Sequence, residues 1–228
     1  MKVIVNTGNE ELDRRLGGIP FPSLILIEGD HGTGKSVISA QIAYGLLISK
    51  MKGYIITTEQ STYGYLKKMS EIKVDLIPFF LKGQLGVAPV NTPRFSWNLT
   101  IAKKLLYLIH DFIGKVKDFV VIDSLTVIST FSSEEDLMEF FRGLRVYVTE
   151  GKSIIITIHP NFPEELQTRI KSEVDVYFKL SAATIGNTRV KVLEKVKISE
   201  GIIGADSISF NVDPTLGIKV VPLSLSRA

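Results

Sequence analysis

One eight-residue segment, Gly29 to Ser36, constrains what this chain can fold into more than any other. It reads GDHGTGKS, in which four residues separate two glycines and the second glycine is followed by lysine and serine. The apolar run Leu24 to Ile27 precedes it, and Lys35 to Ser49 has the pattern of a helix. A loop of this kind between a strand and a helix turns backbone N–H groups inward around a phosphate. The segment therefore predicts a nucleotide-binding loop; a tight turn without a nucleotide is the alternative.

Within this loop, Lys35 is expected to place its charge against the β- and γ-phosphates, and Ser36 to offer its hydroxyl to a magnesium ion. His31 stands at a variable position and is expected only to line the site. ATP and Mg²⁺ are the cofactors implied. The residues expected to bind the nucleotide are Gly29, Asp30, His31, Gly32, Thr33, Gly34, Lys35, Ser36 and Val37, together with Asp123 and His159 from later in the chain.

Three further polar residues follow apolar, strand-like runs. Asp123 ends the run Phe119 to Ile122 and is expected to hold a magnesium-bound water, unless it caps the next turn. Glu59 follows the run Tyr54 to Ile56. If its strand lies beside the phosphate-loop strand or one removed, Glu59 faces the γ-phosphate as a general base or a water-positioning group; the alternative is a solvated strand end. His159 follows Ile154 to Ile158, either as a sensor of the γ-phosphate or as a structural histidine.

The order of these runs predicts an α/β fold. Apolar strands alternate with amphipathic helices, the clearest over Ile101 to Val116 and from the capping box at Ser132–Glu135 to Val148, which predicts a mostly parallel sheet covered on both faces. Antiparallel strands are expected at its C-terminal edge. Val190, Val192, Val196 and Ile198 recur at period-two spacing there, followed by strands near 208–210 and 218–221. Leu76 to Pro93 is expected to be irregular, with a short strand over Gln84 to Val87. The length of 228 residues fits one domain, 1–228.

Composition excludes several classes of site. The chain has no cysteine, which rules out disulfides and thiolate metal sites, and its three histidines lack metal-like spacing. Basic residues come in pairs and not in blocks, so nucleic-acid binding is permitted but not indicated. No secretory signal and no apolar run of membrane-spanning length is visible, so a cytoplasmic protein is expected.

The stretch TGNEELDRRLGGIPFPSLILIEGDHGTGKS, Thr7 to Ser36, resembles the start of KaiC-like ATPases of the RecA superfamily. FVVIDSLT, Phe119 to Thr126, is similar to the magnesium-binding strand of that family. KVLEKVKISEG, Lys191 to Gly201, falls where relatives carry a lysine and an arginine that reach a neighbouring subunit's nucleotide. The resemblance spans nearly the whole chain and implies a RecA-like nucleotide-binding core, with Lys195 and Lys197 in that catalytic role in trans.

Within that family the chain is most similar to the ATP-binding components of the archaellum, the archaeal swimming motor. This resemblance implies a regulator that docks on the motor ATPase beneath the membrane platform. It also implies a homo-oligomer, such as a hexameric ring, that forms with ATP. Such a protein is peripheral to the membrane only through its partners.

Three departures from the family pattern bear on turnover and loop geometry. Relatives carry two glutamates after the second strand, whereas this chain has Glu59 and Gln60. Relatives with strong catalysis between subunits carry Lys-x-Arg, whereas Lys195 and Lys197 lack the arginine and its planar, two-pronged contact. Phe21–Ser23 replaces the family's glycine after Ile-Pro. The first two changes leave binding intact and favour slow hydrolysis.

Three functions therefore compete. The first is an ATP-binding switch that assembles with a partner ATPase and has slow or no turnover. The second is an autonomous KaiC-like ATPase with Glu59 as its base. The third is a RadA-like recombination accessory protein, which needs basic loops after the strands that end at Asp123 and Ile158. Ser129 to Ser133 has no basic residue, and Asn161 to Ser172 mixes both signs of charge, so nucleic-acid binding is disfavoured.

Overall fold

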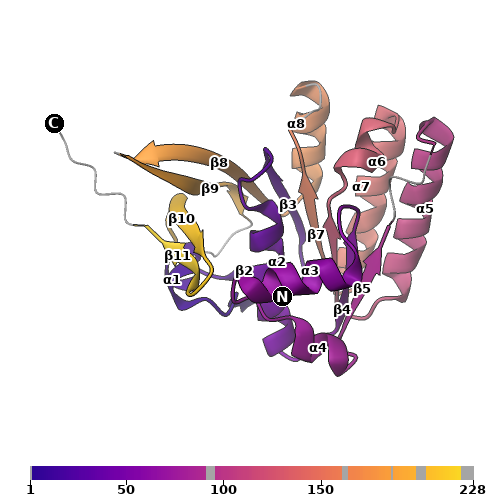
Figure 1. The fold of residues 1–228 in the computed structure, drawn as a ribbon. Helices are drawn as coiled ribbons and strands as arrows, with labels where there is room; N and C mark the ends of the chain where they lie inside the picture. The colour runs from indigo at the N-terminus through magenta and orange to yellow at the C-terminus, as the bar shows by residue number, and fades with distance from the viewer. Residues whose placement is uncertain (1, 91–95, 161–163, 186, 199–203, 222–228) are drawn as a thin grey trace.

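A computed structural model describes residues 2–90, 96–160, 164–185, 187–198 and 204–221 (Figure 1). The strands are β1 Val3–Val5, β2 Ile19–Phe21, β3 Leu24–Gly29, β4 Gly53–Thr57, β5 Leu85–Pro89, β6 Phe119–Asp123, β7 Ser153–Ile158, β8 Val176–Ile185, β9 Thr188–Ile198, β10 Ser207–Asp213 and β11 Gly217–Val220. The helices are α1 Glu10–Leu16, α2 Lys35–Ile48, α3 Thr62–Glu71, α4 Ile77–Leu81, α5 Leu99–Lys115, α6 Thr126–Thr130, α7 Glu134–Thr149 and α8 Glu164–Glu173.

The main sheet has nine strands in the order β11-β10-β9-β8-β3-β7-β6-β4-β5. The six strands from β8 to β5 are parallel, and β9, β10 and β11 extend the sheet by antiparallel pairing. The predicted α/β class and its antiparallel edge are therefore confirmed. Because parallel strands end at a common edge, the turns after β3, β7, β6 and β4 meet there.

Each face of the sheet has its own buried core. On one face, α1, α2 and α3 bury residues such as Leu12, Ile38 and Tyr65 against the strands. On the other face, α5 to α8 bury residues such as Ile113, Phe141 and Ile170, and Figure 1 shows these helices grouped on one side. Successive strand residues point to opposite faces, so central strands that contribute to both cores are apolar at almost every position.

Helices occur in the segment expected to be irregular and in the two segments considered as DNA loops. Within residues 76–90, α4 covers Ile77–Leu81 and β5 covers Leu85–Pro89, so the short strand expected near Gln84 exists and a helix precedes it. Residues 91–93 lie outside the described part. Of the two segments that a DNA-binding function would need as loops, Ser129–Ser133 overlaps the end of α6 at residues 129 and 130, and α8 occupies residues 164–172 of Asn161–Ser172, of which 161–163 are not described. α4 and α6 are only five residues long, too short for apolar periodicity to reveal.

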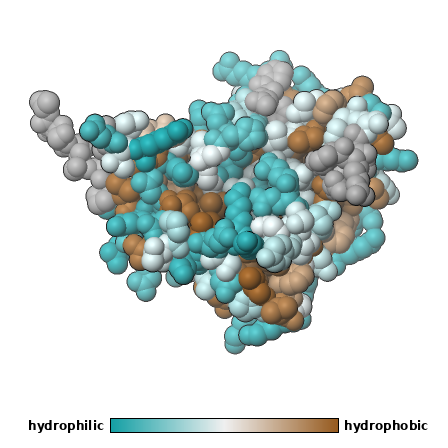
Figure 2. Space-filling view, viewed as in Figure 1, coloured by the Kyte–Doolittle hydropathy of each residue, from teal (hydrophilic) through white to brown (hydrophobic). Residues whose placement is uncertain are grey.

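The surface and the helix ends add two details. Figure 2 shows hydrophobic residues at the lower edge of the view, over α4, where Leu81 is 77% exposed.

α7 begins one residue later than the capping box suggested, because Ser133 is the N-cap and its hydroxyl accepts the N–H of Asp136. Among the described residues, no helix is both long and apolar enough to cross a membrane.

The predicted hairpin is β8 and β9, but its alternating pattern is interrupted. Tyr177 pairs with Lys197 and Phe178 pairs with Lys195, which leaves Val196 as an extra residue in a β-bulge. Val190 is buried and Val196 is 49% exposed, whereas Leu193, which the period-two set did not include, joins the core beside α2. The four valine and isoleucine positions therefore do not form one continuous buried face.

Candidate nucleotide-binding site

The phosphate-loop backbone is shaped by two glycines. A Cβ on Gly29 would lie 2.5 Å from the carbonyl oxygen of Leu180, so only glycine allows β3 to end this close to β8. Gly34 is the N-cap of α2 and has a φ of +100°, and no side chain among the described residues caps this helix. The first N–H groups of α2 are therefore left without a partner inside the helix, which suits them to an anion.

Lys35 is the buried cation of the loop, with 8% of its surface exposed. Its ammonium group donates to the carbonyl oxygens of Gly29 (2.6 Å) and Asp30 (2.9 Å) and lies 3.4 Å from Nε2 of His159. Burial lowers the pKa of Lys35, and the charges of Glu59, Asp123 and Asp30 oppose this effect. Within the described chain no carboxylate forms an ion pair with it, so its charge can act on a phosphate.

Asp123 and Ser36 form the pair that fits a magnesium ion. The Ser36 hydroxyl donates to Oδ1 of Asp123 at 3.1 Å, and the Thr157 hydroxyl donates to the same oxygen at 2.7 Å. Burial raises the pKa of Asp123, while these two hydrogen bonds lower it. No group of three or more metal-ligating side chains occurs among the described residues. One hydroxyl and one carboxylate suit Mg²⁺, which takes its remaining ligands from phosphate and water.

Glu59 reaches the site by a different route from the one expected. Its strand β4 stands three positions from β3, with β6 and β7 between them, so the condition of a strand beside the loop strand or one removed is not met. A contact between the ends of β4 and β6 compensates: Thr58 Oγ1 donates to the carbonyl of Ser124 at 2.8 Å. The exposed Glu59 carboxylate accepts the Ser124 hydroxyl at 3.2 Å, and its charge acts on both Lys35 and Asp123.

Gln60, the neighbour of Glu59, is engaged with α3. With its amide oriented to satisfy both groups, the nitrogen donates to the carbonyl of Gly64 at 3.3 Å. In the same orientation the oxygen accepts from the ammonium group of Lys68 at 3.0 Å. Gln60 thus has a local structural role at the start of α3.

His159 and His31 lie together beside Lys35. Their ring centroids are 3.9 Å apart, and His159 is 5% exposed. The backbone N–H of His159 donates to the hydroxyl of Thr126, at the start of α6, at 3.1 Å. Burial lowers the pKa of His159, and the charges of Lys35 and His31 lower it further. The histidine therefore connects the phosphate loop to the helix that follows β6.

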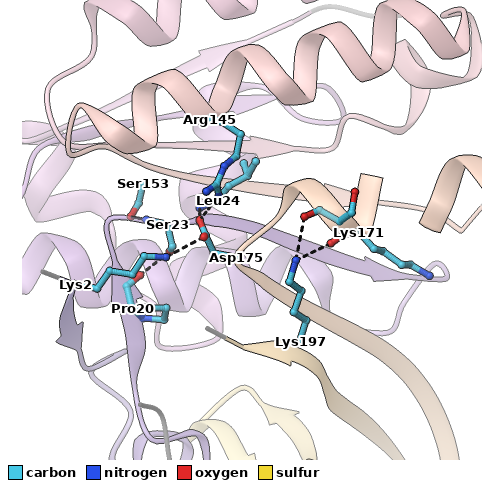
Figure 3. Close-up of polar contacts among 10 residues, drawn as sticks. Lys2, Pro20, Ser23, Leu24, Arg145, Ser153, Lys171, Asp175 and Lys197 are labelled. Carbon is cyan, nitrogen blue, oxygen red and sulfur yellow. Dashed lines mark hydrogen bonds and ion pairs between the residues drawn. The ribbon is translucent and has the colours of Figure 1, made fainter. Parts of the chain in front are cut away.

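Lys195 and Lys197 lie apart in the structure. The Lys195 ammonium is 3.5 Å from the carbonyl of Leu16 at the end of α1. Lys197 donates to the carbonyls of Lys171 and Ser172, both at 3.1 Å, at the end of α8 (Figure 3). The bulge at Val196 sends the two side chains to different neighbours. Their contacts here are within one chain, and the role in trans remains a prediction.

Figure 3 also shows the surroundings of Lys197, at the end of β3 opposite the phosphate loop. Asp175 binds the ammonium of Lys2 at 2.9 Å and the guanidinium of Arg145 at 2.8 Å, and it accepts the N–H of Leu24 at 2.9 Å. Leu24 is the first residue of β3, whereas the loop follows its last residue, Gly29. These contacts anchor the base of the sheet.

Two residues of the site were not anticipated. Thr157, which fixes Asp123, is the one polar residue in the apolar run Ile154 to Ile158, and that position was its only signal in the sequence. Lys191 on β9 approaches the loop so closely that a Cβ on Gly34 would lie 3.2 Å from its Cδ. Lys191 also borders an open hollow of about 610 Å³, lined in part by Arg189, Asp213 and Lys219. Nothing in the sequence placed β9 beside the loop.

Comparison with known proteins matches this architecture. The family model described as "ATPase: KaiC" matches residues 5–224. The archaeal flagellar ATP-binding protein FlaH of Sulfolobus acidocaldarius is 60% identical over 228 residues, covering 99% of this chain and all of the relative. FlaH of Methanocaldococcus jannaschii is 30% identical over 95% of this chain and 94% of its own. The crystal structure of that flagellar accessory protein superposes with a TM-score of 0.82 at 27% identity, over 97% of this chain and 100% of its own.

Proposed function

The chain belongs to the KaiC ATPase family, among the archaeal flagellar ATP-binding proteins, and we therefore propose that it is a nucleotide-dependent switch of the archaellum. In this role it binds ATP with Mg²⁺, assembles with the partner motor ATPase in the cytoplasm, and turns ATP over slowly or not at all. Bound nucleotide shifts the population toward the assembled state.

One arrangement supports the binding of a magnesium nucleotide above all. Three features lie together at the carboxyl edge of the sheet: the uncapped N-terminus of α2, the buried Lys35, and the pair of Ser36 with Asp123. Each group is suited to a different part of a magnesium nucleotide. The helix N-terminus and the lysine suit phosphate, and the hydroxyl and carboxylate suit the metal with its waters. The metal would neutralise phosphate charge when bound, while Thr157 keeps the Asp123 carboxylate oriented.

The residues around the γ-phosphate position favour sensing over turnover. His159, beside Lys35, bonds through its backbone to Thr126, so a change at the phosphate can pass to α6. Lys195 and Lys197 contact their own chain and, being lysines, cannot supply the planar contact of an arginine. An arginine of this kind can contribute several orders of magnitude to rate. A ring that assembles with ATP and docks beneath the membrane platform is part of the proposal.

Loss of ATP binding should abolish assembly with the partner. We expect Lys35→Ala and Asp123→Ala to lower ATP affinity by about 100-fold, or about 3 kcal/mol, which is the upper end for a hydrogen bond to a charged group. The measurement is binding of a fluorescent ATP analogue by each variant, followed by pull-down with the purified motor ATPase. Lys104→Ala, which removes an exposed cation on α5, is the matched control. Full assembly by a variant that binds no ATP would overturn the switch.

An autonomous ATPase is the second candidate, and one observation favours it: Glu59 lies close enough to act on the charges of both Lys35 and Asp123. A carboxylate in this place can orient or deprotonate a water. Steady-state phosphate release at a rate of about 1 per second or more that disappears in Glu59→Gln would establish this candidate. The third reading, a DNA-binding accessory protein, has less support, because Ser129 to Ser133 has no basic residue and α8 occupies residues 164–172 of the second stretch.

A further inference from the structure

An open groove lies between α5 and α7. Figure 1 shows these two helices side by side on the face of the sheet that α5 to α8 cover. The groove has a volume of about 350 Å³. Its floor is apolar, formed by the buried Leu106 and Phe140, while the ring of Tyr107, 72% exposed, stands at its rim. A solvent-exposed aromatic ring beside an apolar hollow is the usual form of an anchor site for a partner side chain.

Gly143 lines the groove and leaves room for His110 of α5. It lies in the interior of α7, where glycine costs about 1 kcal/mol relative to alanine. A Cβ on Gly143 would lie 2.7 Å from Nε2 of His110, so the glycine lets α5 pack closely against α7. A second hollow, of about 800 Å³ and extending to Arg169 on α8, shares Gly143 and Glu139 with the first. The two hollows therefore form one continuous surface across α7.

The charges on this surface do not balance. Lys103 is paired with Asp136 at 2.7 Å, Arg169 with Glu134 at 3.8 Å, and Arg142 with Glu173 at 3.5 Å. Glu135 and Glu139, both exposed on α7, have no ion pair within the described part of the chain. Two carboxylates without an ion pair thus stand beside an apolar floor, and the charge of Lys103, which is paired with Asp136, also acts on both of them.

We infer that the α5–α7 groove is a docking site for a basic amphipathic segment of another protein, which inserts an apolar side chain beside Tyr107 and places lysine or arginine against Glu139 and Glu135. An amphipathic helix in a groove uses this combination of apolar anchors and charged flanks. The lining carries four carboxylates against the three cations Lys103, Arg142 and Arg169, and this excess of negative charge favours a basic segment over nucleic acid or anionic lipid. The inference rests on the proposed function only in taking the partner to be a motor component.

The test uses the full chain without nucleotide and a defined probe. The probe is a fluorescein-labelled, helix-forming peptide of leucine and lysine with leucines at i, i+3, i+4 and i+7, and its matched control carries glutamate for lysine. Fluorescence anisotropy in about 0.15 M salt, where surface charges are screened beyond about 8 Å, measures affinity. The variants are Glu135→Lys with Glu139→Lys, and Tyr107→Ala. Glu150→Lys controls for the change of charge alone, because Glu150 is the C-cap of α7 and lies about 16 Å from Glu139 along the helix axis.

We expect the lysine peptide to bind and the glutamate peptide not to bind. The double charge reversal should weaken binding by at least about 10-fold and Tyr107→Ala by about 5-fold, whereas Glu150→Lys stays within about 2-fold. A photoreactive leucine analogue in the peptide should label residues around Tyr107 and Phe140. Equal losses in Glu150→Lys, no loss in the double variant, or labelling confined to another surface would each overturn the inference.

Two further measurements distinguish a peptide-binding groove from a contact between copies of the chain and from the nucleotide switch. If Tyr107→Ala changes the sedimentation of the chain alone, a second copy occupies the groove and the inference is wrong. Lys35→Ala, which tests the proposed switch, should leave peptide binding within about 2-fold of the parent. Failure of the switch with intact peptide binding, or the reverse, therefore shows which of the two proposals is mistaken.

Discussion

At the scale of single residues, burial disfavours the charged form of both ionisable groups at the centre of the site, Lys35 and Asp123. It lowers the pKa of Lys35 and raises the pKa of Asp123, so it disfavours the ion in both cases. Opposite charges and hydrogen bonds hold both groups in place: Lys35 rests on two carbonyl oxygens and Asp123 on two hydroxyls. Such a site is arranged for a ligand that brings its own negative charge together with a cation.

His159 predicts a pH dependence of stability. Its pKa in the folded chain is lowered by burial, whereas in the unfolded chain it returns to about 6.5. Below that value the unfolded chain binds a proton that the folded chain resists. The contribution of the neutral His159 to the free energy of unfolding is therefore fully present above about pH 6.5, and it is lost as the pH falls through the folded pKa. We expect the urea midpoint to fall more between about pH 7.5 and pH 5.5 in the parent than in His159→Gln. Equal falls would contradict this assignment.

The variant Gln60→Glu tests whether the amide at this position is the cause of slow ATP hydrolysis. If the amide in place of a carboxylate is what slows hydrolysis, Gln60→Glu should accelerate phosphate release. Because the amide contacts Gly64 and Lys68, we expect the new carboxylate to pair with Lys68 and the rate to change by less than about 2-fold. Phosphate release by the variant and the parent measures this, and a rise of about 10-fold or more would show that residue 60 takes part in hydrolysis.

The sequence predicted the position of a site residue correctly where that position depends only on the strand and helix next to it in the chain. The loop from Gly29 to Ser36 lies between β3 and α2 as expected, and Asp123 ends β6. Thr157 was missed because its importance comes from a contact with another strand. Gln60 was interpreted through the family pattern, and its local contact with α3 gives a different role.

Among the helices and strands, the late strands show how one extra residue changes a prediction. Lys195 and Lys197, two residues apart, would share a face in a regular strand. The bulge at Val196 instead sends one to the end of α1 and the other to the end of α8. A bulge leaves little signal in a period-two pattern, and the helices that receive the two ammonium groups depend on tertiary packing.

Lys197 makes a testable distinction between a local and a trans role. Its ammonium lies on two carbonyls at the end of α8, where a cation stabilises a helix by about 0.3–1 kcal/mol. We therefore expect Lys197→Ala to lower the free energy of unfolding by that amount, as measured in urea, with Lys104→Ala as control. ATP-dependent assembly should be unchanged. Loss of assembly or of phosphate release at unchanged stability would instead support the role in trans.

Across the molecule as a whole, the site depends on strand order, which local patterns do not specify. The alternation of strands and helices predicted the class and both helical layers. It did not predict that β7 and β6 separate β3 from β4, an order that makes the Thr58–Ser124 contact the route by which Glu59 reaches the loop. A single domain spanning residues 1–228 stays a prediction.

An ATP-dependent switch with little turnover predicts the outcome of one paired measurement of mass and rate. The mass of the full chain is determined by light scattering with and without ATP and Mg²⁺, and phosphate release is followed in the same sample. We expect ATP to increase the mass toward that of a ring while fewer than about 0.01 phosphates are released per chain per second, far below a typical enzyme rate. Lys35→Ala should keep its nucleotide-free mass. A mass that ignores ATP, together with release at about 1 per second or faster, would contradict the proposed switch.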